Sequence, residues 1–150
     1  MEDEYVLLLV EDNADHAELV CRCLEAQPIR HRVVHLADGE STLAYLTRRP
    51  PFDAVDEAPT PHLVLLDLRL PKVDGLDVLR AVKALPDLRK IPVVVLTSSA
   101  AEPDVSRAYA AHANSYLVKP LDSDHLERML GDVGRYWLGW NQPPAAVASG

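Results

Sequence analysis

The chain has 150 residues, a formal net charge of −8 and a pI near 5.1, a length typical of one domain. Hydrophobic residues make up 48% of the chain, enough for a core that needs neither disulfides nor a structural metal. The acidic balance argues against a nucleic-acid-binding surface, which needs clustered lysine and arginine. The apolar runs are shorter than the roughly 18 residues that cross a bilayer, and the acidic start Met1–Glu4 is unlike a signal peptide. We therefore expect a cytoplasmic protein with no membrane partner.

Apolar runs and amphipathic stretches alternate along the chain. Five runs are typical of strands buried in a sheet: Tyr5–Val10, His31–Leu36, His62–Leu66, Pro92–Leu96 and Ser115–Val118. Apolar residues at helical spacing follow each run and predict helices around Ala17–Leu24, Leu43–Leu46, Leu76–Leu85, Pro103–Ala111 and Leu126–Trp137. Strands that alternate with helices predict a parallel α/β sheet. The residue pattern leaves the strand order open.

Two segments lack this periodicity. The stretch Arg49–Pro61 is rich in proline and acidic residues and predicts a long exposed loop. Residues 141–150 predict a disordered tail, so we expect one domain over residues 1–140. Cys21 and Cys23 lie two positions apart on a predicted helix and are interpreted as buried free thiols.

Polar residues follow four of the five predicted strands. Their positions are Glu11 and Asp12 after the first strand, Asp67 after the third, Thr97 after the fourth and Lys119 after the fifth. Taken singly, each has an ordinary interpretation: a helix cap, a turn, a polar strand end or a solvated charge. Ligands of doubly wound sheets bind at the carboxyl ends of the strands, so the joint placement favours a functional site.

Elementary electrostatics narrows the chemistry of that site. Three clustered carboxylates raise one another's pKa values, and a hard divalent cation such as Mg²⁺, which prefers oxygen ligands, relieves the repulsion. With Mg²⁺ and Lys119 the three carboxylates sum to a formal charge of zero, which suits a phosphoryl group. A carboxylate can then act as nucleophile and form an aspartyl phosphate, while the cations neutralise the transferring group.

The chain resembles the receiver domain of bacterial two-component response regulators. The segments that carry the resemblance are LLVEDN (8–13), LLDLRLPKVDG (65–75), VVVLTSS (93–99) and YLVKPL (116–121), and the match extends over residues 5–137. It implies a flavodoxin-like (βα)5 fold, a three-layer sandwich with strand order 2-1-3-4-5, and a phosphoacceptor protein rather than a conventional enzyme.

The resemblance also implies residue roles. Asp67 is the phosphoacceptor, Glu11 and Asp12 hold Mg²⁺ with Asp67, and the backbone carbonyl of Arg69 completes the metal site. Thr97 and Lys119 contact the phosphoryl group, and Tyr116 is the aromatic switch that moves with Thr97. Lys119–Pro120 is expected to be a cis peptide. Phosphorylation would change the surface formed by the fourth helix, fifth strand and fifth helix. Arg69 and Ser99 occupy positions that tune the lifetime of the acyl phosphate.

The chain is also similar to single-domain regulators that are paired with bacterial phytochromes. This similarity lies in the Arg49–Pro61 loop, the IPVVVLTSS segment and the aromatic element Tyr136–Leu138. It implies a photoreceptor histidine kinase as partner and a homodimer through the fourth helix, fifth strand and fifth helix. Only ten residues follow Trp140, so we expect the output to be a surface. Tyr136, Trp137 and Trp140 are its candidate interface residues, although they can instead cover the core.

Other functions compete with this interpretation. A phosphatase of the haloacid dehalogenase type needs a second Asp two positions after Asp67, where this chain has Arg69. A nucleotide-binding module needs a glycine-rich phosphate loop, and neither G-x-G-x-x-G nor G-x-x-x-x-G-K-[ST] occurs. A receiver-like scaffold that works without phosphorylation, or a phosphorelay intermediate, remains the alternative. The six histidines are interpreted as structural or surface residues.

Overall fold

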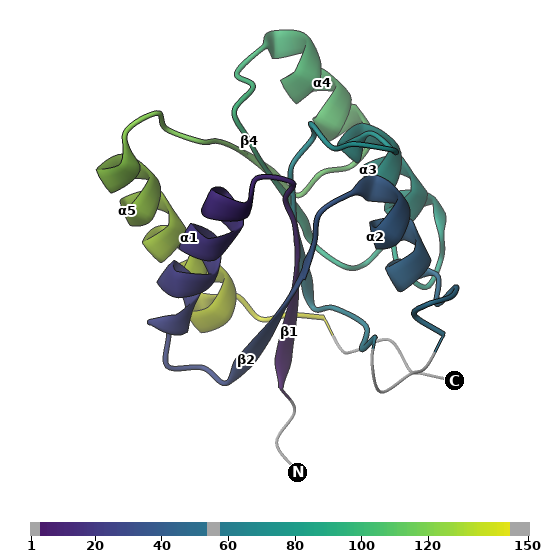
Figure 1. Cartoon of the computed structure of the whole chain (residues 1–150), viewed down its shortest axis with the longest axis horizontal. Coiled ribbons are helices and arrows are strands. Elements are labelled where there is room, and N and C mark those ends of the chain that lie inside the picture. Colours follow the sequence, from purple (N-terminus) through teal and green to yellow (C-terminus); the bar gives the residue numbers. More distant parts are fainter. Residues whose placement is uncertain (1–3, 54–57, 145–150) are drawn as a thin grey trace.

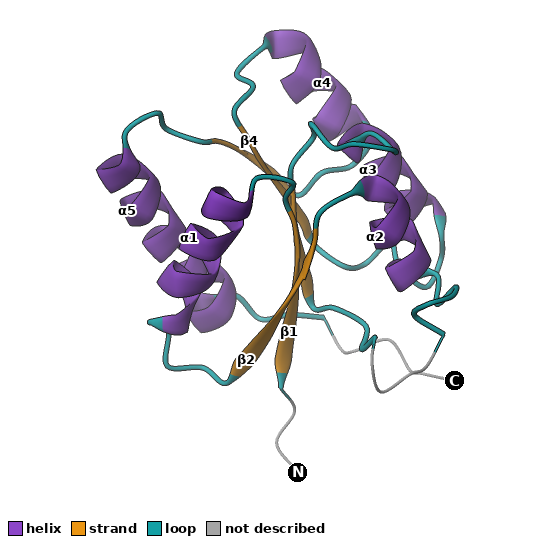
Figure 2. Ribbon diagram, in the orientation of Figure 1, coloured by secondary structure: helices purple, strands orange, loops and turns teal. Residues whose placement is uncertain are grey.

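A five-stranded parallel sheet forms the middle layer of a three-layer α/β sandwich (Figure 1). The structure is a computed structural model that describes residues 4–53 and 58–144. The strand order is β2-β1-β3-β4-β5, which confirms the flavodoxin-like order. Helices α1 and α5 cover one face of the sheet, and α2, α3 and α4 cover the other (Figure 2).

The strands follow the apolar runs to within one residue. They are β1 (Tyr5–Val10), β2 (His31–Leu36), β3 (Leu63–Leu66), β4 (Val93–Thr97) and β5 (Ser115–Val118). The three central strands are buried throughout because helices cover both faces. The edge strands β2 and β5 are mostly half-buried.

The helices begin at polar caps or prolines. They are α1 (Ala14–Glu25), α2 (Gly39–Leu46), α3 (Gly75–Ala84), α4 (Glu102–Ala110), α5 (Ser123–Gly134) and the π-helix η2 (Arg135–Trp140). The side chains of Asn13, Asp38 and Asp122 accept hydrogen bonds from backbone N–H groups in the first turns of α1, α2 and α5. Pro103 lies in the first turn of α4, where its missing N–H costs no hydrogen bond.

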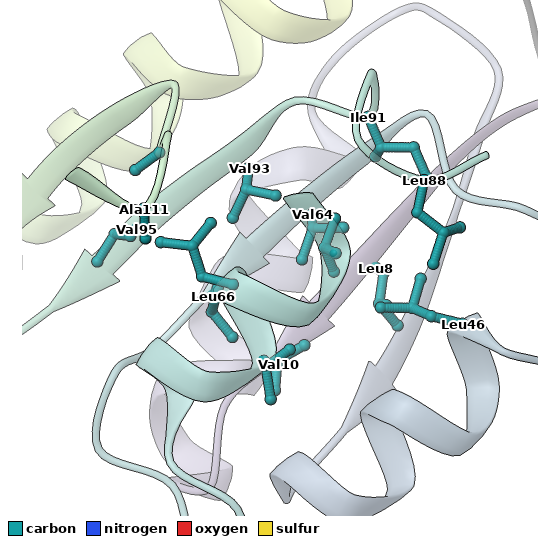
Figure 3. Packing of buried hydrophobic residues seen from close by; sticks show 14 of the residues in the cluster. Leu8, Val10, Leu46, Val64, Leu66, Leu88, Ile91, Val93, Val95 and Ala111 are labelled. Carbon is teal, nitrogen blue, oxygen red and sulfur yellow. The ribbon is translucent and has the colours of Figure 1, made fainter. Parts of the chain in front are cut away.

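The sheet divides the hydrophobic core into two clusters. The cluster toward α2, α3 and α4 includes Leu66, Val95 and Leu79 (Figure 3). The cluster toward α1 and α5 includes Leu65 and Leu130. Consecutive residues of one strand enter opposite clusters because side chains alternate across a sheet. Packing on both faces of the sheet therefore fixes where each strand ends and in which direction it points.

The structure corrects three expectations. In the described chain Pro50–Pro51 is the cis peptide and Lys119–Pro120 is trans; the isomers of an X–Pro bond differ by only about 0.5–1 kcal/mol, so the dipeptide alone does not select one. Cys21 and Cys23 are free but only half-buried. The row of apolar residues along the last helix is expected to end at Trp137. The wider π turn of η2 instead buries Leu138 and leaves Trp137 half-buried.

The two aperiodic segments lie partly outside the described residues. Residues 54–57 of the predicted loop and 145–150 of the predicted tail are not described. The described parts of the predicted loop, residues 49–53 and 58–61, contain no helix or strand, but Ala58 and Pro61 are buried, so the loop is not exposed throughout. No helix in the described part of the chain is long and apolar enough to cross a membrane.

Candidate functional site

Four strand ends meet at one edge of the sheet. Val10 of β1 is in register with Leu66 of β3, so the residues that follow them, Glu11 and Asp67, are neighbours. The backbone N–H of Asp67 donates to the carbonyl of Val10 (3.0 Å). In the same way the N–H of Lys119 donates to the carbonyl of Thr97 (2.8 Å). Sheet hydrogen bonding therefore extends to the site residues and positions them.

Three carboxylates form the acidic cluster predicted from the sequence. Oxygen atoms of Glu11, Asp12 and Asp67 lie within 4.8 Å of one another. Glu11 and Asp67 are buried, whereas Asp12 is exposed. Capping of the first helix was one ordinary interpretation of Asp12. The cap is Asn13, whose side chain accepts from the N–H of His16 (3.0 Å). Asp12 is therefore available to the cluster.

Lys119 supplies the positive charge of the site. Its Nζ donates to Asp67 Oδ2 (3.2 Å) and to Glu11 Oε1. The Lys119 side chain is only 4% exposed, and a buried ammonium group is costly unless acidic partners surround it. The Asp67 carboxylate has a further donor in the backbone N–H of Arg69, which donates to Asp67 Oδ1 (3.0 Å).

The two buried carboxyl groups differ in proton affinity. Burial, followed by the adjacent Asp67 carboxyl, raises the pKa of Glu11 from 4.5 to about 7, although Lys119 opposes the change. Burial also acts to raise the pKa of Asp67, but hydrogen bonds from Glu11, the Arg69 N–H and Lys119 outweigh it and leave that pKa below its ordinary value. Asp67 is therefore the group that stays ionised, as a nucleophile must.

The cluster fits a divalent cation. Glu11 Oε2 is buried, and no described residue gives it a hydrogen bond, so an ionised Glu11 has an uncompensated oxygen that faces two further carboxylates. Carboxylate oxygens are the preferred ligands of Mg²⁺, and Mn²⁺ accepts the same donors. A bound divalent ion would supply charge neutralisation for an incoming phosphoryl group.

Thr97 and Tyr116 lie beside this cluster on the neighbouring strands. Thr97 is completely buried, and its Oγ1 has no hydrogen-bond partner among the described residues. A buried hydroxyl without a partner is costly, so it can gain from an oxygen placed in the site. The Tyr116 ring packs against the core on the α3–α4 side, and its hydroxyl donates to the carbonyl of Ser99 (2.8 Å).

Gly75 allows the loop after β3 to close over the site. A Cβ at this position would overlap the carbonyl oxygen of Asp67 and would lie 2.6 Å from the Cα of Leu68. Both neighbours are backbone atoms, so neither can move aside by changing its rotamer. A residue without a side chain is therefore required where α3 begins.

Sequence reasoning missed one residue of the site. His16 Nδ1 lies 3.2 Å from Lys119 Nζ and 3.4 Å from Glu11 Oε1, although nothing in its residue type separates it from the other histidines. Its position in the first turn of the helix after β1 was the available signal, because that turn faces the carboxyl ends of the strands.

The predicted interface residues lie elsewhere. Tyr136, Trp137 and Trp140 belong to η2, which follows α5 near the end of the sheet opposite to the acidic cluster (Figure 1). Trp140 is 85% exposed, whereas Trp137 packs against the core between α1 and α5. The acidic cluster and the aromatic residues of η2 are therefore two separate features of the structure.

Known proteins share this arrangement. Residues 7–131 match the response regulator receiver domain family. The chain is 47% identical over 143 residues to "Probable methanogenesis regulatory protein FilR2" of Methanothrix harundinacea, covering 95% of this chain and 90% of that protein. It is 41% identical over 141 residues to response regulator Rcp1 of Synechocystis sp., covering 94% of each chain.

Solved structures agree. The Mn²⁺-bound form of Rcp1 superimposes with a TM-score of 0.90 at 40% identity, covering 94% of this chain and 99% of that one. The phosphorylated cyanobacterial phytochrome response regulator RcpA also gives a TM-score of 0.90, at 35% identity, covering 95% and 100% of the two chains. The fold, the acidic cluster and these similarities lead to one conclusion: the chain belongs to the response regulator receiver family and is a two-component signalling protein.

Proposed function

We propose that the protein accepts a phosphoryl group on Asp67 from a histidine kinase in a Mg²⁺-dependent reaction. An Asp67 carboxylate oxygen forms a bond to phosphorus while the bond from phosphorus to the donor breaks, and the donor leaves with the electron pair. The chain itself promotes this transfer and the later hydrolysis. ATP, the phosphoryl source of kinases, is cytoplasmic, so we expect the reaction to take place in the cytoplasm.

One observation carries this proposal. Asp67 is the carboxyl group of the cluster whose pKa stays below its ordinary value, and it belongs to the acidic cluster while accepting a hydrogen bond from the buried Lys119 ammonium. Glu11, Asp12 and the Arg69 carbonyl would hold the metal. Lys119 and Thr97 would contact the phosphoryl oxygens.

The signal would leave through the surface formed by α4, β5 and α5. Phosphorylation adds about −1.5 to −2 of charge, which favours an inward position of Thr97 and Tyr116. We propose that a second copy of the chain binds this surface. Exposed apolar residues on and beside these elements support the proposal: Tyr109, Val118, Leu121, Tyr136 and Trp140.

A bacteriophytochrome kinase is the donor we propose. Similarity to Rcp1 and to RcpA, the latter described as a phytochrome response regulator, supports it. A phosphotransfer profile against purified histidine kinases, with a bacteriophytochrome among them, tests this choice. Faster transfer from an unrelated kinase would contradict it.

Acetyl phosphate provides the direct test of Asp67. We expect a mass gain of one phosphoryl group that requires Mg²⁺ and is lost in Asp67→Asn, whereas Asp53→Asn, an exposed carboxylate elsewhere, retains it. If neither acetyl phosphate nor any kinase phosphorylates the parent, the phosphorylation-independent scaffold is the better interpretation. Return of the group to a kinase or phosphotransfer domain would indicate a phosphorelay intermediate.

Light scattering of the purified protein tests the homodimer. We expect a dimer that Trp140→Ala weakens, because that side chain is largely exposed in the single chain. A strict monomer at high concentration, with and without a phosphoryl mimic, would rule the dimer out.

A further inference from the structure

A second polar network lies next to the acidic cluster and involves none of its carboxylates. Its centre is Asp104 in α4, whose Oδ2 accepts a hydrogen bond from Ser99 Oγ (2.5 Å) and one from Arg69 Nη2 (3.2 Å). Arg107, one turn further along α4, lies 3.8 Å from the other carboxylate oxygen. Asp104 thus joins the loop after β3 to the loop after β4.

The network reaches the switch tyrosine. Ser99 uses its hydroxyl on Asp104 and its carbonyl on the Tyr116 hydroxyl (2.8 Å). Two hydrogen bonds, one through its hydroxyl and one through its carbonyl, therefore hold Ser99 in position. A chain of three contacts leads from Arg69, two residues after Asp67, to the residue expected to change position on phosphorylation.

The Arg69 side chain is not held by burial. The Arg69 side chain is 73% exposed and lines an open cavity of about 330 Å³ together with Leu68, Asp74, Leu76, Asp104 and Arg107. The Ser99 hydrogen bond, and then Arg69 and Arg107, hold the pKa of Asp104 below its ordinary value, so its carboxylate is charged at neutral pH. The ion pair is accessible to water and therefore weak.

We propose that Arg69 is shared between two anions: it binds Asp104 in the resting protein and the phosphoryl group on Asp67 in the phosphorylated protein. Asp104 is then a positioning residue that holds Arg69, Ser99 and Tyr116 in the resting arrangement. This inference rests on the proposed phosphorylation of Asp67. It adds a coupling between the site and α4 that begins at a side chain of the β3–α3 loop.

Charge gives the direction of the exchange. A phosphoryl group carries about −1.5 to −2 and offers several acceptor oxygens, and its hydrogen bonds to a guanidinium group are charge-assisted. A single carboxylate that is open to solvent is the weaker competitor. When Arg69 leaves, Asp104 loses one of its two hydrogen-bond donors, and Ser99 and Tyr116 lose part of their support. Phosphorylation thereby favours the alternative arrangement, because the two states differ in these contacts.

A double-mutant cycle tests the exchange, with beryllofluoride in saturating Mg²⁺ as the phosphoryl mimic and NMR titration as the readout. Asp104→Asn removes the competing charge and keeps the size of the side chain. We expect it to tighten beryllofluoride binding about twofold to fivefold, the range of an exposed ion pair. Arg69→Gln should weaken beryllofluoride binding. In the double variant, Asp104→Asn should not change the beryllofluoride affinity any further. The Tyr116 ring signals of unliganded Asp104→Asn should shift toward their beryllofluoride-bound positions.

A matched control comes from α3, where Asp77 and Arg80 form an exposed ion pair of similar length (3.3 Å). Asp77→Asn should leave beryllofluoride affinity unchanged. The inference is overturned if Asp104→Asn has no effect, if its effect is the same with and without Arg69, or if Asp77→Asn reproduces it. If the parent itself does not bind beryllofluoride, the proposed function falls together with the inference. If the parent binds beryllofluoride but the effects of Arg69→Gln and Asp104→Asn on its affinity are simply additive, the inference is wrong and the proposed function is unaffected.

Discussion

Glu11 should make the stability of the metal-free protein depend on pH. Its pKa rises from 4.5 to about 7 on folding because burial and Asp67 disfavour the ionised form. An acid whose folded pKa is raised contributes stability that is fully present below its unfolded pKa and is lost as the pH rises through the folded value. At 1.36 kcal/mol per pKa unit, the difference between 4.5 and about 7 corresponds to at most about 3–4 kcal/mol.

Urea unfolding in EDTA measures this contribution. The free energy of unfolding of the parent should fall between about pH 5 and about pH 7.5, and Glu11→Gln, which is neutral throughout, should lose most of that decrease. Asp67 does not interfere, because its pKa is lowered and its contribution is lost only at acidic pH, at and below its ordinary value of 3.8. Equal pH dependence in parent and variant would refute the assignment of the buried proton to Glu11.

Three further substitutions test the packing around the site, each by urea unfolding. Gly75→Ala places a methyl group against the backbone of Asp67 and Leu68 and should cost about 1–3 kcal/mol; unchanged stability would show that the loop can move. Leu130→Ala empties a fully buried position and should cost about 2–5 kcal/mol, whereas Glu18→Ala, at an exposed position of α1, should cost almost nothing. Asp38→Ala removes the acceptor of the Ser41 N–H (2.7 Å) and should cost about 1 kcal/mol, while Asp38→Asn keeps most of the cap.

The sequence predicted most of the fold because the apolar runs are strongly patterned. The run Tyr5–Val10 is buried at every position, as a central parallel strand requires. The site was predicted because its polar residues end strands of that sheet. The partners of those residues were harder to anticipate: the contact from His16 to Lys119 spans 103 positions, and only the packing of α1 brings the two together.

Other features could not be predicted because their alternatives differ little in energy or depend on distant contacts. In the sequence Asp104 looks like an ordinary charge near a helix start, and its contact with Arg69 exists only because α4 packs beside the β3–α3 loop. The π turn of η2 buries Leu138 and leaves its neighbour Trp137 half-buried against the same core, a difference that helical periodicity does not resolve.

Strands β1 and β3 end at the same level of the sheet, and this restricts where such proteins can accept insertions. Val10 and Leu66 are in register, and Glu11 and Asp67 are the next residues in their chains. A one-residue insertion within either strand would turn the following carboxylate to the opposite face of the sheet. Insertions in loops at the opposite edge would leave both side chains in place. Sequence length should therefore vary freely in the segment before β3, and a library that randomises residues 47–53 should retain the site, whereas one that lengthens β1 should not.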